Sequence, residues 1–257
     1  MSQLQKKIGR IQRRESPRGI GFGSVVRDQP RGMLLAVIVN DKASATAAVN
    51  AGADAVIFKG ANGQAVAKAL GGLDTKAVTA GAWVDTLDDA GAKALREAGC
   101  DFAISTLETT ASTAVDVEEM GQVIKVAEDI DDTTLRALGP LSLDALYIER
   151  PAAAMTLAGQ LSLVRLASFS NTPLTVPVTA DAQVSELRVL RDSGTVMVVA
   201  PAGTGAEAIK TLVENLKSLP APKRSRRDGQ EMALVPSIAS AGQEHEDDDG
   251  DGDGDDE

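Results

Sequence analysis

The chain has 257 residues, of which 43% are hydrophobic and only 2% aromatic, and its formal net charge is −11. The length fits one large domain or two small ones, and the few aromatic residues leave Ala, Val, Leu and Ile to build the core, as in a parallel sheet covered by helices. No apolar run is long enough to cross a bilayer, and the basic N-terminus lacks the apolar segment of a secretion signal, so we expect a cytoplasmic protein without membrane contacts.

The chain has one cysteine and one histidine, which limits the kinds of catalytic and metal sites that it can form. Cys100 has no second cysteine to pair with, and its position before an expected strand favours burial over a nucleophilic role. His245 lies in a run of acidic residues near the C-terminus. Histidine-based catalysis and multi-histidine metal sites are therefore nearly excluded, and we predict no metal site.

Charged residues mark the two ends of the chain. Residues 1–32 form a basic N-terminal arm that begins with a short helix near residues 2–14. At the other end, residues 244–257 hold 10 acidic residues and no Lys or Arg, which leaves 27 acids against 26 bases elsewhere. Such a tail cannot bury apolar surface, so we predict that it is disordered and that residues 220–243 link it to a nearly neutral folded body.

Between the two ends, residues 33–219 alternate short apolar runs with helical patterns. Eight runs predict strands: 33–39, 54–58, 77–84, 101–105, 123–127, 145–149, 173–178 and 196–200. Helical patterns separate most of them, at 43–51, 62–70, 86–98, 156–168, 182–193 and 204–219. Strands that alternate with helices indicate βαβ units and a parallel sheet. Eight such units are the number that closes a (β/α)8 TIM barrel, and a doubly wound parallel sheet is the alternative.

An internal repeat favours the closed barrel. Similar sequences lead into the second, fourth and sixth strands, with Asp54, Asp101 and Asp144 at equivalent positions, and Thr195 takes this place before the eighth. The intervals of 43 to 51 residues each fit two βα units, as a fourfold barrel requires. Little room for helices remains in 107–121 and 130–142, and Pro177 should end the seventh strand early.

Catalytic groups of such a barrel lie on the loops that follow the strands. The repeat places Lys59 and Glu149 at equivalent heights on the second and sixth strands, which are opposite each other in a ring of eight. A lysine facing a carboxylate across the mouth is suited to act as an acid/base pair, or as a Schiff-base nucleophile with its proton shuttle. The alternative is a salt bridge that closes the mouth, or two solvated side chains.

A second candidate site is the turn after the eighth strand. Gly203, Thr204 and Gly205 let the backbone approach an anion closely, and the helix that follows offers free N–H groups. With this turn and the AGADAV-like repeats, residues 33–219 resemble the aldolase-type, phosphate-binding TIM-barrel proteins as a class. The resemblance implies a phosphate held by the loops after strands seven and eight. This chain departs from that pattern because its loop after strand seven, VTADAQVS, has no glycine. An ordinary helix cap is the alternative role of the turn.

Two functions follow from these features and stay open. The first is a TIM-barrel protein that binds a small phosphorylated ligand and acts as a lyase or isomerase through Lys59 and Glu149. The second is a non-catalytic barrel that acts as a binding or scaffold protein through its charged tails, and the barrel segment is indeed shorter than the roughly 250 residues usual for the fold. Nucleic acid is a poor partner, because the acidic tail repels phosphates and few aromatic residues are present. The sequence indicates no particular cofactor and no oligomeric state.

Overall fold

The chain folds into a closed ring of eight parallel strands in which each strand pairs with its neighbours in sequence order and β8 pairs with β1. The structure, a computed structural model, describes residues 2–15, 31–75, 77–116 and 118–220. The strands are β1 (Leu34–Val39), β2 (Ala55–Asn62), β3 (Ala80–Thr86), β4 (Phe102–Thr106), β5 (Gly121–Ala127), β6 (Ala145–Glu149), β7 (Leu174–Pro177) and β8 (Thr195–Ala200). The predicted TIM barrel is confirmed, and the doubly wound alternative is wrong.

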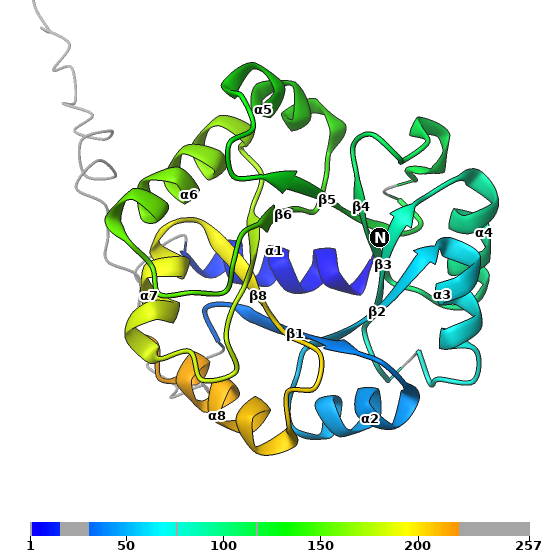
Figure 1. The fold of residues 1–257 in the computed structure, drawn as a ribbon, viewed down its shortest axis with the longest axis horizontal. Coiled ribbons are helices and arrows are strands. Elements are labelled where there is room, and N and C mark those ends of the chain that lie inside the picture. Colours follow the sequence, from blue (N-terminus) through cyan, green and yellow to red (C-terminus); the bar gives the residue numbers. More distant parts are fainter. Residues whose placement is uncertain (1, 16–30, 76, 117, 221–257) are drawn as a thin grey trace, which may run out of the picture. The chain divides into compact units, whose positions relative to one another are not determined.

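Helices surround the ring in chain order (Figure 1). They are α2 (Lys42–Asn50), α3 (Gly63–Leu70), α4 (Asp89–Glu97), α5 (Asp132–Leu138), α6 (Leu157–Ser170), α7 (Val184–Asp192) and α8 (Ala206–Lys217). The shortage of room predicted between β4 and β5 is real, because only a short 3₁₀ turn, η1 (Ser112–Ala114), follows β4. A second such turn, η2 (Gly139–Leu141), precedes β6, and β7 ends at Pro177 as expected.

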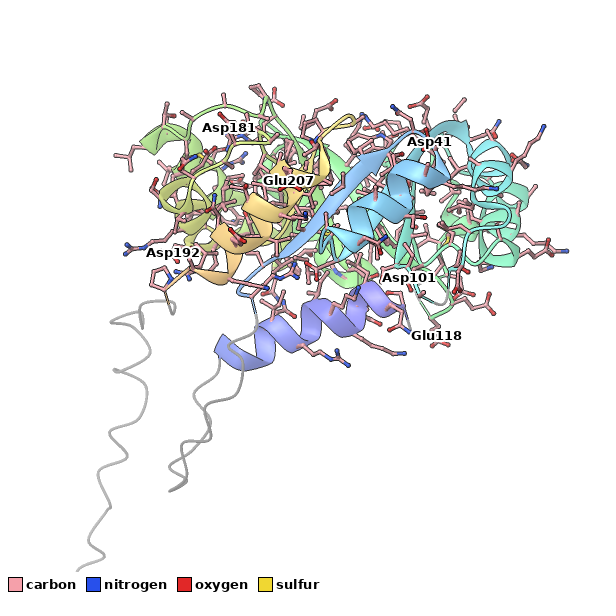
Figure 2. The ribbon with its side chains drawn as sticks, turned by 90° about the horizontal axis from the view of Figure 1, so that it is seen from below. Asp41, Asp101, Glu118, Asp181, Asp192 and Glu207 are labelled. Atoms are coloured by element: carbon pink, nitrogen blue, oxygen red, sulfur yellow. The ribbon has the colours of Figure 1, made fainter. Side chains whose placement is uncertain are left out.

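Helix α1 (Gln3–Glu15) closes the end of the barrel where the strands begin, and it crosses the middle of the ring in Figure 1. Its apolar side chains Leu4, Ile8 and Ile11 are buried in one cluster with the side chains that point into the barrel. The first turn is fixed by Asp101, whose carboxylate accepts hydrogen bonds from the backbone N–H groups of Gln3 and Leu4 at 2.6 and 2.8 Å. Figure 2 shows α1 below the barrel beside Asp101, while Asp41 and Asp181 lie at the opposite end.

Two of the repeated aspartates, Asp54 before β2 and Asp144 before β6, tie their strand to the strand before it. The backbone N–H of Asp54 bonds to Leu35 O, and its carboxylate accepts from Leu35 N at 2.9 Å. Asp144 bonds to Gln122 in the same two ways, with 3.0 Å from Gln122 N to its carboxylate. The repeat therefore has a structural role at the α1 end of the barrel, away from the loops that follow the strands.

The barrel interior is filled rather than hollow. Phe102 enters the ring beside Gly81, where a Cβ atom would lie only 2.3 Å from the Phe102 ring. A ligand therefore has no path through the barrel, and α1 covers the lower end, so the carboxyl ends of the strands are the accessible face. Among the described residues, no helix is both long and apolar enough to cross a membrane. Residues 16–30 of the N-terminal arm and 221–257, with the linker, the acidic tail and His245, lie outside the described part of the chain.

Candidate functional site

The mouth of the barrel, at the carboxyl ends of the strands, contains two aromatic side chains that cover the filled interior. Trp83 on β3 and Tyr147 on β6 are the chain's only tryptophan and only tyrosine. Their ring centroids lie 4.6 Å apart in an edge-to-face arrangement, a geometry that aromatic pairs prefer. Burial raises the pKa of the Tyr147 hydroxyl to about 12, with a smaller contribution from the nearby charge of Glu149. Tyr147 is therefore a neutral hydroxyl at physiological pH.

Lys59 reaches this aromatic pair from β2. Its Nζ atom lies 4.0 Å from the centre of the Trp83 ring, within the range of a cation–π interaction. Lys59 and Trp83 are paired neighbours on adjacent strands, and Trp83 packs against the interior cluster. The lysine thus lies on the inward side of β2 with an exposed side chain.

Glu149 lies on β6 two residues beyond Tyr147, on the same side of the strand because side chains alternate along it. Its Oε1 atom accepts from Lys125 Nζ of β5 at 3.3 Å. The structure therefore places both predicted catalytic residues at the mouth but gives each its own partner: Lys59 contacts Trp83, and Glu149 contacts Lys125. The predicted opposition of β2 and β6 follows from the ring, in which they stand four strands apart.

Lys125 was missed by the sequence reasoning. It pairs with Tyr147 in the β5–β6 register, so it shares the inward side of the sheet, and its side chain is 23% exposed. The signal was present in the sequence, because a lysine in the middle of the apolar run VIKVA must point either into the barrel mouth or into the helix layer. Only the register of the sheet distinguishes these two directions.

A pocket of about 400 Å³ opens beside this ion pair, at the carboxyl ends of β4, β5 and β6. Its size lies in the range of small-molecule sites. Lys125, Glu149, Glu108 and Thr106 supply polar side chains, and apolar residues such as Ile130 form the remaining walls. The pocket thus offers an ammonium group, two carboxylates and a hydroxyl to one bound molecule. Within the residues that the structure describes, no group of three or more His, Cys, Asp or Glu side chains is suited to hold a metal ion.

The predicted anion loop lines a second pocket, of about 290 Å³, between the ends of β1 and β8. Gly203 has a φ of +81°, a left-handed conformation that glycine adopts without strain. Thr204 donates its hydroxyl to Pro201 O at 2.8 Å and so stabilises the turn itself. Gly205 is the N-cap of α8, and no side chain accepts from the first N–H groups of this helix.

The absence of a side-chain cap distinguishes α8 from most helices that follow a strand. Asp41, Asn62, Asp88, Asp131 and Thr156 cap α2 to α6, each by accepting a backbone N–H, whereas the described residues provide no such cap for α7 or α8. The uncapped start of α8 lines the pocket, where the positive end of the helix dipole favours an anion.

One negative side chain shares this second pocket. Asp41 lines it from the start of α2, and its carboxylate accepts from Ser44 N at 2.7 Å. Hydrogen bonds from Ser44 hold the pKa of Asp41 below its usual value. The charge of Asp41 opposes an anion in the pocket, but the N–H groups of α2 already stabilise this charge locally.

The chain is similar to known proteins in its fold only. No protein-family model matches it, and no curated protein does. Among solved structures it is similar to tryptophan synthase from Mycobacterium tuberculosis, with 16% identity and a TM-score of 0.59 over 86% of this chain and 99% of that chain. It is also similar to phosphoribosyl anthranilate isomerase from Thermus thermophilus, with 15% identity and a TM-score of 0.50 over 73% of this chain and 100% of that chain. The chain shares the TIM-barrel fold of these proteins, and the resemblance expected from its sequence is confirmed at the level of the fold.

Proposed function

We propose that the protein binds a small phosphorylated ligand at the mouth of its barrel and acts on it as a lyase or isomerase. The phosphoryl group would lie against Gly203, Thr204 and Gly205, and the rest of the ligand would extend toward the lysines and Glu149. The observation that carries the proposal is the uncapped start of α8 on a pocket, because free N–H groups at a helix N-terminus bind phosphate. The name of one structural neighbour, phosphoribosyl anthranilate isomerase, is in line with this class of ligand.

The mouth supplies the groups that an isomerisation by proton transfer requires. The Glu149 carboxylate would take a proton from a carbon beside a carbonyl group, while the Lys59 or Lys125 ammonium group donates a hydrogen bond to the carbonyl oxygen as negative charge develops there. In a ligand with a hydroxyl group on that carbon, the carbonyl oxygen would take a proton from the ammonium group, and the hydroxyl group would give its proton to the amine that is left. Glu149 would then return its proton to the former carbonyl carbon, so that the carbonyl group has moved by one carbon and both side chains are regenerated. If a lysine instead forms a Schiff base with the carbonyl, reduction with borohydride would leave a permanent mass increase on that lysine.

Phosphate binding is tested at Gly205. This residue has an ordinary φ of −68°, and a Cβ atom built on it meets nothing within 4 Å, so a side chain is accommodated there. Gly205→Asp would cap α8 with its own carboxylate and repel phosphate, because aspartate is a preferred N-cap residue. Gly205→Ala is the matched control, since it adds a Cβ atom without charge.

Calorimetric titration with inorganic phosphate and with glycerol 3-phosphate measures the effect. We expect millimolar or tighter binding to the unmodified protein and to Gly205→Ala, and at least tenfold weaker binding to Gly205→Asp, which corresponds to about 1.4 kcal/mol. Equal affinities of the two variants, or no binding of either compound to the unmodified protein at millimolar concentration, would refute the phosphate site.

The non-catalytic alternative is favoured by a different observation. An apolar surface without charged residues lies beside the mouth on the β6–α6 loop and α6, and such surfaces are typical of protein–protein contacts. Of the charged tails predicted to have this role, residues 16–30 of the basic arm and the whole acidic tail lie outside the described residues. A binding protein of this kind would keep its partner when Glu149 is replaced by Gln, whereas the proposed enzyme would lose turnover.

A further inference from the structure

The hydroxyl group of Tyr147 is a polar group at the mouth for which the structure shows no partner. The side chain is only 6% exposed, and none of the described residues forms a hydrogen bond with its hydroxyl. A buried tyrosine hydroxyl normally has a partner, so one that lacks it needs an explanation. Two other hydroxyls, those of Thr175 and Thr195, also lack a partner, but their oxygen atoms are fully buried. The Tyr147 oxygen is not among these buried atoms, so it faces the open space of the mouth.

The ring of Tyr147 is held in place by its neighbours, which fixes the position of the hydroxyl. Its centroid lies 4.6 Å from that of Trp83, edge to face, and the ring belongs to the cluster of buried side chains inside the barrel. The register of the sheet places Lys125 beside it on β5 and Thr175 beside it on β7. A side chain held in this way loses little conformational entropy when a ligand binds.

Glu149 lies close to this hydroxyl. It stands two residues further along β6 on the same face of the strand, with the two Cα atoms roughly 7 Å apart. The negative charge of Glu149 contributes to the raised pKa of Tyr147, so the two groups interact. A ligand that presents a C–H group to Glu149 therefore brings the neighbouring atoms of its skeleton toward the Tyr147 hydroxyl.

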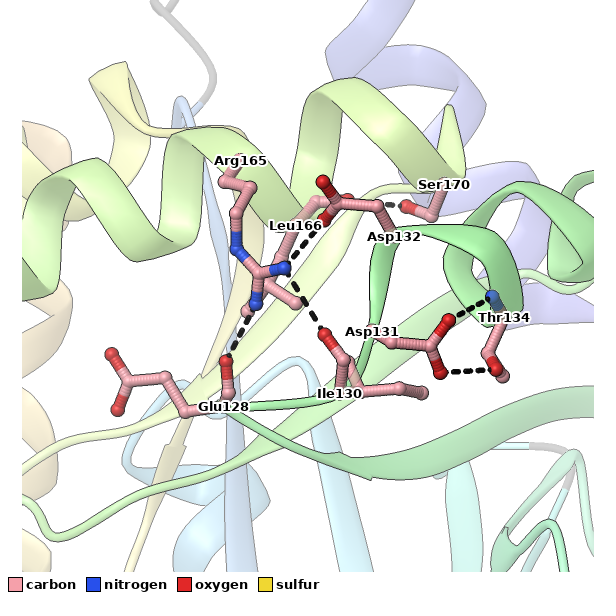
Figure 3. A network of polar contacts seen from close by, with 8 residues as sticks. All are labelled: Glu128, Ile130, Asp131, Asp132, Thr134, Arg165, Leu166 and Ser170. Atoms are coloured by element: carbon pink, nitrogen blue, oxygen red, sulfur yellow. Dashed lines mark hydrogen bonds and ion pairs between the residues drawn. The ribbon is translucent and has the colours of Figure 1, made fainter.

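Two arginines on this side of the barrel have partners outside the mouth. Arg150 follows Glu149, so its side chain leaves the opposite face of β6, and it donates to Met155 Sδ at 3.1 Å. Arg165 of α6 donates to Glu128 O at 2.9 Å in the loop after β5 (Figure 3). Both guanidinium groups are therefore directed toward the helices, and neither replaces the tyrosine hydroxyl as a donor at the mouth.

We propose that Tyr147 is a further catalytic residue, whose hydroxyl donates a hydrogen bond to the ligand oxygen on which negative charge develops when Glu149 removes a proton from the neighbouring carbon. This role rests on the proposed function. Together with a lysine ammonium group, the hydroxyl gives this oxygen two donors, as in an oxyanion hole. The pKa of about 12 keeps the proton on Tyr147, so the phenol donates a hydrogen bond throughout the reaction and does not ionise.

Calorimetric titration of the full chain with two phosphorylated compounds tests this role. Phosphoglycolate carries a carboxylate, whose charged oxygen stands for the developing oxyanion, whereas glycerol 3-phosphate carries only uncharged hydroxyl groups beside its phosphate. Tyr147→Phe removes the hydroxyl and keeps the ring against Trp83. The matched control is Thr175→Val, which removes another hydroxyl without a partner, at a fully buried position on the neighbouring strand. Each variant loses only an unpaired hydroxyl, so both should fold, and thermal unfolding checks it.

We expect Tyr147→Phe to bind phosphoglycolate at least about tenfold more weakly, because a hydrogen bond to a charged oxygen is lost, and to bind glycerol 3-phosphate with less than about a twofold change. Thr175→Val should bind both compounds as the unmodified protein does. Phosphoglycolate should also shift the near-ultraviolet absorbance of the phenol. This signal belongs to Tyr147, the only tyrosine of the chain, and should be absent from the difference spectrum of Tyr147→Phe.

An unchanged affinity of Tyr147→Phe for phosphoglycolate, equal losses for both compounds, or no shift of the phenol absorbance would overturn the role of Tyr147 while the phosphate site stands. The same loss in Thr175→Val would also overturn it, because the effect would then belong to the barrel interior as a whole. If neither compound binds to the unmodified protein at millimolar concentration, the proposed function fails and the role of Tyr147 fails with it.

Discussion

Asp144 provides a prediction whose size follows from the structure. Its side chain is only 6% exposed, one carboxylate oxygen accepts from Gln122 N, and the other, Oδ1, has no hydrogen-bond partner among the described residues. Burial raises the pKa of Asp144 from 3.8 to about 6, against the opposing hydrogen bond from Gln122. Each pKa unit corresponds to about 1.4 kcal/mol, so ionised Asp144 lowers the free energy of unfolding by about 3 kcal/mol.

The sign of the pH dependence follows from the raised pKa. Below pH 3.8 the carboxyl is protonated in both the folded and the unfolded chain, so it has no effect on stability. Between pH 3.8 and about 6 the unfolded chain releases the proton more readily, and the folded state loses stability as the pH rises. Above about 6 the loss is complete and constant.

Urea unfolding at a series of pH values measures this effect against Asp144→Asn, which keeps an oxygen for Gln122 N but does not ionise. Relative to this variant, the unmodified protein should lose about 3 kcal/mol between pH 3.5 and pH 7.5. Asp131→Asn is the control of opposite sign, because hydrogen bonds from Thr134 lower the pKa of Asp131 and ionisation there stabilises the fold. A difference between the unmodified protein and Asp144→Asn that does not change with pH would refute the reasoning.

Three further predictions concern the frame of the barrel. Gly63→Ala should lower the free energy of unfolding by about 1 to 3 kcal/mol, because the new Cβ atom would lie 2.5 Å from the backbone of Gly91 in the neighbouring helix. The control Gln64→Ala should change the free energy of unfolding in urea by less than about 0.5 kcal/mol. Equal effects of the two variants would contradict the close contact. Asp101→Ala removes the carboxylate that accepts the first N–H groups of α1, and it should lower the free energy of unfolding by about 0.5 to 2 kcal/mol. Amide hydrogen exchange in α1 should become faster. Unchanged exchange would show that the helix does not depend on this cap. Tyr147 should be only about 10% ionised at pH 11 by near-ultraviolet absorbance, and full ionisation of the folded protein at that pH would exclude its burial.

The sequence was sufficient to predict the barrel architecture, because the patterns that indicate a barrel are local in the sequence. The eight apolar runs and the helical patterns between most of them are short-range signals, and the Asp54 and Asp144 repeat reflects contacts between consecutive strands. The position of α1 was not predictable in this way. Its contact with Asp101 joins residues almost 100 positions apart, and nothing near Gln3 in the sequence indicates it.

The candidate site was predictable only in part, for a related reason. Counting strands placed Lys59 and Glu149 at the mouth, since the ring fixes which strands are opposite. The direct partners of these residues, Trp83 and Lys125, depend on the register between neighbouring strands, which a single sequence does not show. The sequence predicted a helix at 156–168, but it did not show that the one charged residue of this helix, Arg165, contacts the loop after β5 and α5.

The most direct test of the account is a map of amide chemical shifts during titration with glycerol 3-phosphate. If the mouth binds a phosphorylated ligand, the largest changes should appear at residues 203–206 and at the ends of β5 and β6 near Lys125 and Glu149, and the emission of Trp83 should change at the same concentrations. Changes centred on α1 or the opposite end of the barrel, or none at millimolar ligand, would contradict the claim that this mouth is the functional site.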